Sequence, residues 1–232
     1  MFLVINNMIN FNFRNLRILS FSAHPDDEIW GAGGLLLQAK KEGSTLKLVL
    51  CLDPAESRQN KSPNQERNIR LKEFRKVSRL LNSKLSYLGM ERYPETKLNN
   101  ILPLVKEIRK FRPDIILTLS EEDYHPDHRA ICSITKEAIW HAGRNAFPEF
   151  GKPFKTKTLI QYEGDKPMSN IDFLRDISDV IDQKKQLLSL YDSQTKQKDL
   201  ISAMEGLNRF RGVMYKTGNY AEAFKITEFF YG

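Results

Sequence analysis

Short apolar runs alternate with longer amphipathic segments along the first two thirds of this 232-residue chain, and this alternation restricts the fold most strongly. Four short apolar runs indicate buried strands: 16–24, 46–53, 85–89 and 114–120. Four longer segments carry apolar residues at helical spacing: 29–41, 64–82, 98–111 and 126–142. Strands and helices in this order imply right-handed crossovers and a mostly parallel sheet covered on both faces. We therefore predict an α/β fold, a three-layer sandwich around a Rossmann-like sheet.

The last third is less regular. It predicts a strand at 157–163, a long helix at 171–191, a helix at 199–212 and a closing strand at 223–230. The sequence shows no linker, repeat or low-complexity segment, so we expect residues 1–232 to form a single domain. Residues 1–13 lack the features of a signal peptide and are expected to be an extra edge strand or a disordered tail.

Composition restricts the binding partners and the cellular compartment that we expect. The 36 Lys and Arg residues exceed the 29 Asp and Glu residues, which gives a net charge of +7. A solvated basic surface explains this balance, and attraction to an anionic small molecule is the alternative. We expect no nucleic-acid partner, because basic and aromatic residues are not interleaved, and no membrane partner, because no run is long enough to span a bilayer. Cys51 and Cys132 lie in apolar segments and predict buried thiols in a reducing cytoplasm. The sequence is compatible with a homo-oligomer.

Polar residues gather directly after two of the predicted strands. The first cluster is His24-Pro25-Asp26-Asp27-Glu28, and the second is Asp123-Tyr124-His125-Pro126-Asp127-His128. Three of the four histidines of the chain lie in these clusters. Ligands of open α/β sheets bind beyond the carboxyl ends of the strands, where both clusters are expected. Each cluster alone is also suitable turn and helix-capping material, so the functional interpretation depends on their joint occurrence.

Two imidazoles and one carboxylate, with one position left for water, are the ligands of a catalytic zinc site. We predict His24, Asp27 and His128 as these ligands. A closed structural site more often contains cysteines, and neither cysteine is near a cluster. Two histidines and one aspartate accept ferrous iron as well as zinc, so Zn2+ is the expected cofactor and Fe2+ the alternative.

The remaining polar residues suggest acid–base roles. Asp26 is adjacent to the ligand Asp27 and is the candidate general base for the metal-activated water. His125 is the candidate group that stabilises the oxyanion formed when water attacks an amide carbonyl. Asp127 is expected to hold the ring of His125 or to keep it protonated. The glycines at 31, 33 and 34 are explained by close packing of a helix on the sheet.

At these residues the chain resembles the LmbE-like, or PIG-L, family of zinc-dependent deacetylases. The resemblance rests on both histidine motifs in this order and continues through three weaker motifs: Arg70-Leu71-Lys72-Glu73, Tyr191-Asp192-Ser193-Gln194 and Tyr220-Ala221-Glu222-Ala223-Phe224. It implies the same metal ligands, the base Asp26, the oxyanion role of His125, and Arg70 as a residue that binds substrate. The greatest similarity is to the branch that deacetylates N-acetylglucosaminyl malate in bacillithiol synthesis.

The resemblance therefore implies a hydrolase that removes the N-acetyl group from a small molecule containing N-acetylglucosamine and releases acetate and a free amine. One alternative is a zinc amidase that cleaves a larger amide of an aminosugar thiol conjugate. Another is a non-catalytic α/β binding module in which both clusters are turns.

Overall fold

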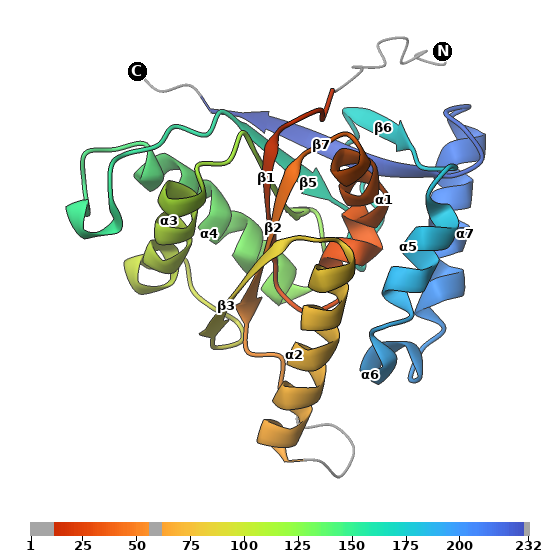
Figure 1. Cartoon of the computed structure of the whole chain (residues 1–232), viewed down its shortest axis with the longest axis horizontal. Coiled ribbons are helices and arrows are strands. Elements are labelled where there is room, and N and C mark those ends of the chain that lie inside the picture. Colours follow the sequence, from red (N-terminus) through yellow and green to blue (C-terminus); the bar gives the residue numbers. More distant parts are fainter. Residues whose placement is uncertain (1–11, 56–61, 230–232) are drawn as a thin grey trace.

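A seven-stranded sheet carries helices on both faces in the computed structural model, which describes residues 12–55 and 62–229 (Figure 1). The strand order is β3-β2-β1-β4-β5-β7-β6; neighbouring strands from β3 to β5 are parallel, and β7 is antiparallel to both β5 and β6. The strands are β1 (Arg17–Ser22), β2 (Thr45–Leu52), β3 (Lys84–Met90), β4 (Ile115–Leu119), β5 (Thr158–Tyr162), β6 (Phe173–Asp176) and β7 (Ala221–Glu228).

The helices cover the two faces of this sheet. They are α1 (Asp27–Lys41), α2 (Pro63–Leu80), α3 (Leu98–Phe111), α4 (Pro126–Ala142), α5 (Ile181–Leu188), α6 (Asp192–Thr195) and α7 (Leu200–Met214), with a 3-10 turn at Pro148–Phe150. Helices α3 and α4 lie on one side of the sheet, and α1, α5 and α7 lie on the other (Figure 1). The predicted three-layer α/β fold with a mostly parallel sheet is confirmed.

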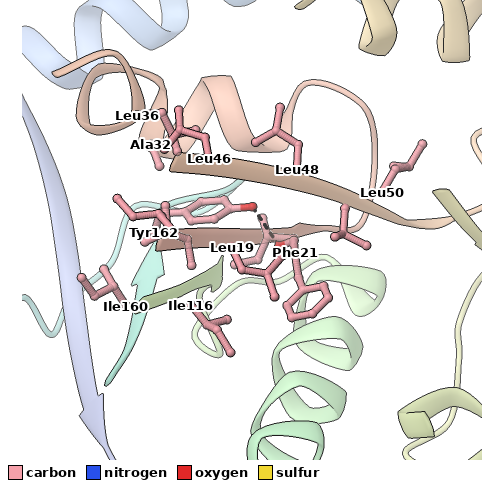
Figure 2. Packing of buried hydrophobic residues seen from close by; sticks show 14 of the residues in the cluster. Leu19, Phe21, Ala32, Leu36, Leu46, Leu48, Leu50, Ile116, Ile160 and Tyr162 are labelled. Carbon is pink, nitrogen blue, oxygen red and sulfur yellow. Dashed lines mark hydrogen bonds between the residues drawn. The ribbon is translucent and has the colours of Figure 1, made fainter. Parts of the chain in front are cut away.

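The core surrounds the central strand β1, where every residue after Arg17 is buried. Figure 2 shows Leu19 and Phe21 of this strand among apolar side chains of the neighbouring strands. Burial of one such side chain contributes roughly 1.5–3 kcal/mol, so the sheet is held mainly by these contacts. The buried hydroxyl of Tyr162 donates to the carbonyl of Phe21 at 3.2 Å, which satisfies its polar atom in the core.

Glycines let α1 closely approach the chain directly after β5 and the segment between β6 and α5. A Cβ atom at Gly31 would lie 2.2 Å from the carbonyl oxygen of Glu163, and one at Gly34 would lie 2.4 Å from Cγ2 of Ile177. Neither position has room for a methyl group. The predicted packing role of these glycines is confirmed.

The predicted helix at 171–191 is wrong in its first half. Residues Phe173–Asp176 form β6, which pairs with β7, and the helix covers only Ile181–Leu188. The side chain of Asp176 accepts hydrogen bonds from the amide and hydroxyl of Ser178, and this local turn separates the strand from the helix. The apolar spacing was interpreted as one helix because pairing with β7 is a tertiary contact that periodicity does not reveal.

The two cysteines agree with the expected buried thiols. Cys51 and Cys132 are buried and unpaired. Most of the segment 1–13, expected to be an edge strand or a disordered tail, lies outside the described residues. None of the helices in 12–55 and 62–229 combines the length and the apolar character needed to cross a membrane. All described strands belong to one sheet.

Candidate metal-binding active site

The two histidine clusters meet at the carboxyl edge of the sheet. Strands β1 and β4 are parallel neighbours, with Ile18 opposite Ile115, so the segments that follow them emerge side by side. His24 lies between β1 and α1, and His128 lies in the first turn of α4. The Nδ1 atom of His24 and the Nε2 atom of His128 are 3.3 Å apart. Both clusters thus lie at the carboxyl ends of neighbouring parallel strands, where ligands of such sheets bind.

The third predicted ligand lies against the same two nitrogens. Carboxylate oxygens of Asp27 are 3.4 Å from Nε2 of His128 and 3.7 Å from Nδ1 of His24. Two ligand atoms bound to one tetrahedral zinc ion at ordinary bond lengths are separated by about 3.4 Å. The donor set and its spacing therefore fit a divalent metal ion.

Two further carboxylates contact the ring nitrogens of His24 and His128 that point away from the candidate metal centre. Oδ2 of Asp127 is 3.0 Å from Nε2 of His24, and Oδ2 of Asp123 is 3.0 Å from Nδ1 of His128. Each carboxylate occupies the ring nitrogen that faces away from the centre, which leaves the inner nitrogen to bind a metal. Carboxylates in this position fix the tautomer and orientation of metal-binding histidines. The sequence placed Asp123 in the second cluster but gave no signal of this role.

The expected role of Asp127 differs from the structure. Its carboxylate contacts His24 and not the ring of His125. It also accepts hydrogen bonds from Nε of Arg92 at 2.9 Å and from the backbone amide of Tyr93 at 2.7 Å. The sequence did not single out Arg92, since it follows β3 and reaches the site only through the fold.

His125 is held by backbone contacts at the entrance to α4. Its amide donates to Oδ1 of Asp123, and its Nδ1 atom accepts from the amide of Asp127 at 3.2 Å. Burial and the neighbouring charge of His128 lower the pKa of His125, so the ring is neutral near neutral pH and carries its proton on Nε2. Ligand-type nitrogens of His24, His125 and His128 all lie within 4.8 Å of one another. His125 can therefore donate a hydrogen bond inside the site.

The protein environment favours positive charge at this centre. Burial lowers the pKa of His128, but the charge of Asp27 and the hydrogen bond to Asp123 outweigh it and raise the pKa to about 10. Burial is outweighed in the same way at His24, where hydrogen bonds to Asp127 and Asp27 raise the pKa. Surroundings that stabilise imidazolium in this way also stabilise a bound cation.

Asp26 has a strained backbone and a perturbed carboxyl group. Its φ of 112° lies in a region that favours glycine, and the residue precedes α1 without a side-chain capping bond. Burial and the adjacent charge of Asp27 raise the pKa of Asp26, while the charge of Arg70 lowers it. A strained residue with a raised carboxyl pKa beside a candidate metal centre is typical of a functional position.

Arg70 is buried on α2 and donates from Nη1 to the carbonyl of Pro54 at 3.0 Å. One turn further along α2, Glu73 accepts hydrogen bonds from the amide and hydroxyl of Ser193 at 2.8 and 2.6 Å. Two of the weaker motifs of the sequence are thus in direct contact. This contact places the 190–195 segment against the helix that carries Arg70.

The remaining motifs anchor α1. The buried hydroxyl of Tyr191 donates to Glu28, whose pKa burial raises to about 8. Glu222 of β7 accepts hydrogen bonds from the amides of Gly34 and Leu35 at 2.6 and 2.8 Å. Both contacts fix the helix whose first turn carries Asp27.

The fold and this site define an α/β protein with a candidate metal centre at the carboxyl edge of its sheet. The model of the PIG-L family, described as GlcNAc-PI de-N-acetylase, matches residues 19–139. The conserved protein TT1542 from Thermus thermophilus is 31% identical, with a TM-score of 0.80, over 90% of this chain and 93% of that one. The chain belongs to the PIG-L, or LmbE-like, family.

Two more distant structures share the fold. N,N'-diacetylchitobiose deacetylase from Pyrococcus horikoshii has a TM-score of 0.81 at 22% identity, over 94% of this chain and 87% of that one. The 4-carboxy-2-hydroxymuconate hydratase GalB from Pseudomonas putida has a TM-score of 0.80 at 21% identity, over 94% of this chain and 97% of that one. The same fold thus carries two reactions, and the reaction must be argued from the site.

Proposed function

We propose that this protein is a metal-dependent deacetylase that hydrolyses the N-acetyl group of a small molecule containing N-acetylglucosamine. Water adds to the acetamido carbonyl, the C–N bond breaks, and acetate and a free amine are released. Family membership supports the reaction class. The observation that carries the proposal is the spacing of His24, Asp27 and His128, whose donor atoms lie 3.3–3.7 Å apart.

In this proposal His24, Asp27 and His128 hold the metal, with Zn2+ as the expected ion and Fe2+ as the alternative. A zinc ion at such a centre polarises the substrate carbonyl and lowers the pKa of a coordinated water molecule to about 7. Asp127 and Asp123 keep the two imidazoles oriented toward the ion.

Asp26 takes the proton from the attacking water and later delivers it to the leaving nitrogen. Its position beside Asp27 supports this role, because the base must be within reach of the water. The neutral His125 donates a hydrogen bond from Nε2 to the oxygen that becomes negative in the tetrahedral intermediate. Arg70 contacts the sugar or its substituent; its buried position near Asp26 supports this assignment.

The substrate is a soluble aminosugar derivative. N-acetylglucosaminyl malate is the specific candidate, because the net charge of +7 favours an anionic substrate. A reducing cytoplasmic setting agrees with the two buried, unpaired thiols.

The decisive experiment measures acetate and amine release from N-acetylglucosamine, its malate glycoside and neutral glycosides, with the metal-depleted protein and the protein reloaded with zinc. The Asp26→Ala variant, loaded with zinc, is measured beside the wild type, and bound metal is determined for both. We expect turnover only with metal, and a loss of about 10²–10⁴-fold in the variant with metal retained, as expected for removal of a general base.

Each other outcome points elsewhere. A wild-type protein that binds zinc and releases no amine from any sugar contradicts the proposal and directs the search to larger amides or to hydration, the reaction named for GalB. If the wild-type protein binds no metal, the two histidine clusters are turns and the proposal is wrong. An Asp26→Ala variant with full activity removes Asp26 from the mechanism.

A further inference from the structure

The segment directly after β5 lies against one side of the candidate metal centre. Gly164 in this segment is buried, and a Cβ atom placed on it would lie 2.3 Å from Oδ2 of Asp123 and 2.8 Å from Nδ1 of His128. These two atoms contact each other at 3.0 Å and their side chains are almost completely buried, so neither can move aside without losing that contact. The φ of Gly164 lies outside the left-handed region. Space, and not backbone conformation, therefore excludes a side chain at this position.

The same segment holds the carboxylate of Asp123 in place. Oδ2 of Asp123 accepts a hydrogen bond from the backbone amide of Asp165 at 3.0 Å, in addition to its contact with Nδ1 of His128. The other oxygen accepts from the amide of His125 at 2.9 Å. Since the amide of Asp165 directly follows Gly164, a side chain at position 164 would push this donor away from the carboxylate. Asp123 is thus held from two sides, by the entrance to α4 and by the segment after β5.

Trp30 joins this segment to the helix that carries another predicted metal ligand. The indole Nε1 of Trp30 donates to the carbonyl oxygen of Gly164 at 2.8 Å, across 134 positions of the sequence. Trp30 lies in α1 almost one turn after Asp27, the first residue of that helix. A chain of contacts therefore connects α1 to His128 through Gly164 and Asp123.

Glu163 anchors the segment on its other side. Its buried carboxylate accepts a hydrogen bond from the amide of Met168 at 2.8 Å and forms an ion pair with Arg211 of α7. Arg211 is also buried and donates to the carbonyl of Met168 at 2.8 Å. Charge-assisted hydrogen bonds of this kind hold their partners in a defined geometry. The backbone on both sides of Gly164 is thus bonded to the rest of the fold.

We propose that Gly164 and Trp30 are positioning residues that fix the orientation of the ligand His128 relative to the ligand Asp27. The inference rests on the metal site of the proposed function and adds two residues that lie outside both histidine clusters. Gly164 leaves the room in which Asp123 and His128 meet, and Trp30 holds Gly164 against them. Groups that orient metal-binding histidines change metal affinity by about 10–100-fold when they are altered.

The first test measures zinc affinity by competition with a chromophoric chelator, without any sugar. The matched control for Gly164→Ala is Gly218→Ala, because a Cβ atom at Gly218 would lie 2.4 Å from the carboxylate of Asp176 at the end of β6. Both variants are expected to lose stability in urea. We expect Gly164→Ala alone to lower zinc affinity, by about 10–100-fold. The visible absorption of the cobalt-loaded protein, which reports ligand geometry, should also change only in this variant.

The second test uses Trp30→Phe, which removes the indole donor and keeps an aromatic ring in the fold. Loss of this hydrogen bond should lower zinc affinity about five-fold. Trp140→Phe, a change in a partly exposed tryptophan near the end of α4, is the control and should keep wild-type affinity. In an Asp123→Ala background, Trp30→Phe should cost no further affinity, because Asp123 transmits its effect.

The outcomes separate this inference from the proposed reaction. A folded Gly164→Ala variant with wild-type zinc affinity overturns the inference, and so do equal losses in Gly164→Ala and Gly218→Ala. If Gly164→Ala does not fold, an unchanged affinity in Trp30→Phe overturns it. Additive losses from Trp30→Phe and Asp123→Ala overturn it as well. A wild type that binds no zinc removes the inference together with the metal site, whereas a protein that binds zinc and releases no acetate contradicts only the proposed reaction.

Discussion

The Nε2 atom of His24 lies 3.0 Å from Oδ2 of Asp127, a residue 103 positions further along the chain. The Asp127 side chain is completely buried and also accepts from Arg92 and from the amide of Tyr93. Burial alone would raise the pKa of Asp127, but the hydrogen bonds from His24 and Tyr93 and the charge of Arg92 outweigh it and hold the pKa well below its usual value. The carboxylate is therefore fully ionised and fixed in position. His24 therefore presents only Nδ1 to the centre.

Substitution of this carboxylate should weaken metal binding without changing the ligands. We expect Asp127→Asn to lower zinc affinity by about 10–100-fold, the usual effect of removing a carboxylate that supports a metal-binding histidine. Competition with a chromophoric chelator measures the affinity. Asp165→Asn, a change in an exposed residue near the site, serves as control. Wild-type affinity in Asp127→Asn would show that His24 is oriented by other contacts.

Arg92 should act through Asp127. Arg92→Ala removes the cation that fixes the carboxylate, so we expect a loss of zinc affinity smaller than that of Asp127→Asn. Arg92→Lys keeps the charge and should recover part of this loss, although a lysine cannot reproduce the two donors of the guanidinium. A double variant of Arg92 and Asp127 should be no worse than Asp127→Asn alone. Additive losses of zinc affinity in the double variant would show that Arg92 does not act through Asp127.

The strain at Asp26 predicts opposite effects on stability and activity. Asp26→Gly places at φ 112° the residue that adopts this angle most easily. After the larger backbone entropy of unfolded glycine is subtracted, we expect the free energy of unfolding to rise by about 1 kcal/mol. Turnover should be lost. Urea unfolding of the metal-free protein provides the measurement, with Lys216→Gly, at φ 56°, as a control for relief of strain outside the site. A decrease in stability for Asp26→Gly would mean that its side chain stabilises the fold.

Local sequence patterns were sufficient to predict most residues of the candidate site. Both histidine clusters follow strands whose apolar runs are unambiguous, and the parallel order of those strands brings His24, Asp27 and His128 together. Arg92 was missed because its role exists only after the segment following β3 reaches Asp127. Asp123 had the right position in the sequence, but its contact with His128 depends on the geometry of the first turn of α4.

The fold was predictable up to β5 for the same reason. Each strand there continues a regular alternation with a helix, and periodicity alone marks both. The alternation of parallel strands and helices ends after β5. Strand β7 pairs antiparallel with β5, and β6 pairs antiparallel with the other edge of β7. A four-residue strand such as Phe173–Asp176 contains too few residues to show a period of two, so its pairing partner determines its structure.

The ion pairs of Glu121 predict a defined pH dependence. Hydrogen bonds and charges from Lys136 and Lys225 lower the pKa of Glu121 from 4.5 to about 2. The unfolded state thus binds more protons between these values, so the stabilisation is complete above pH 4.5 and is lost as the pH falls toward 2. The stability difference between wild type and Glu121→Gln should shrink when urea midpoints are compared at about pH 5 and about pH 3. Because the carboxylate is 42% exposed, about 1 M salt should also reduce it. Glu137→Gln, an exposed change on the same helix as Lys136, serves as the control.

The buried pair of Lys184 and Glu222 predicts a large loss of stability that does not involve the site chemistry. Their side chains are 0% and 1% exposed and 2.7 Å apart, and Glu222 also binds the amides of Gly34 and Leu35 in α1. Glu222→Gln leaves the lysine charge buried without its counter-ion, which costs about 3–5 kcal/mol. Combining it with Lys184→Met should recover most of this loss, because neither member of the pair then carries a buried charge. Asp192→Asn, which breaks the exposed pair with Lys196, should cost less than about 1 kcal/mol in the same urea measurement. Equal losses for the buried and exposed pairs would show that Glu222 does not anchor α1 through charge.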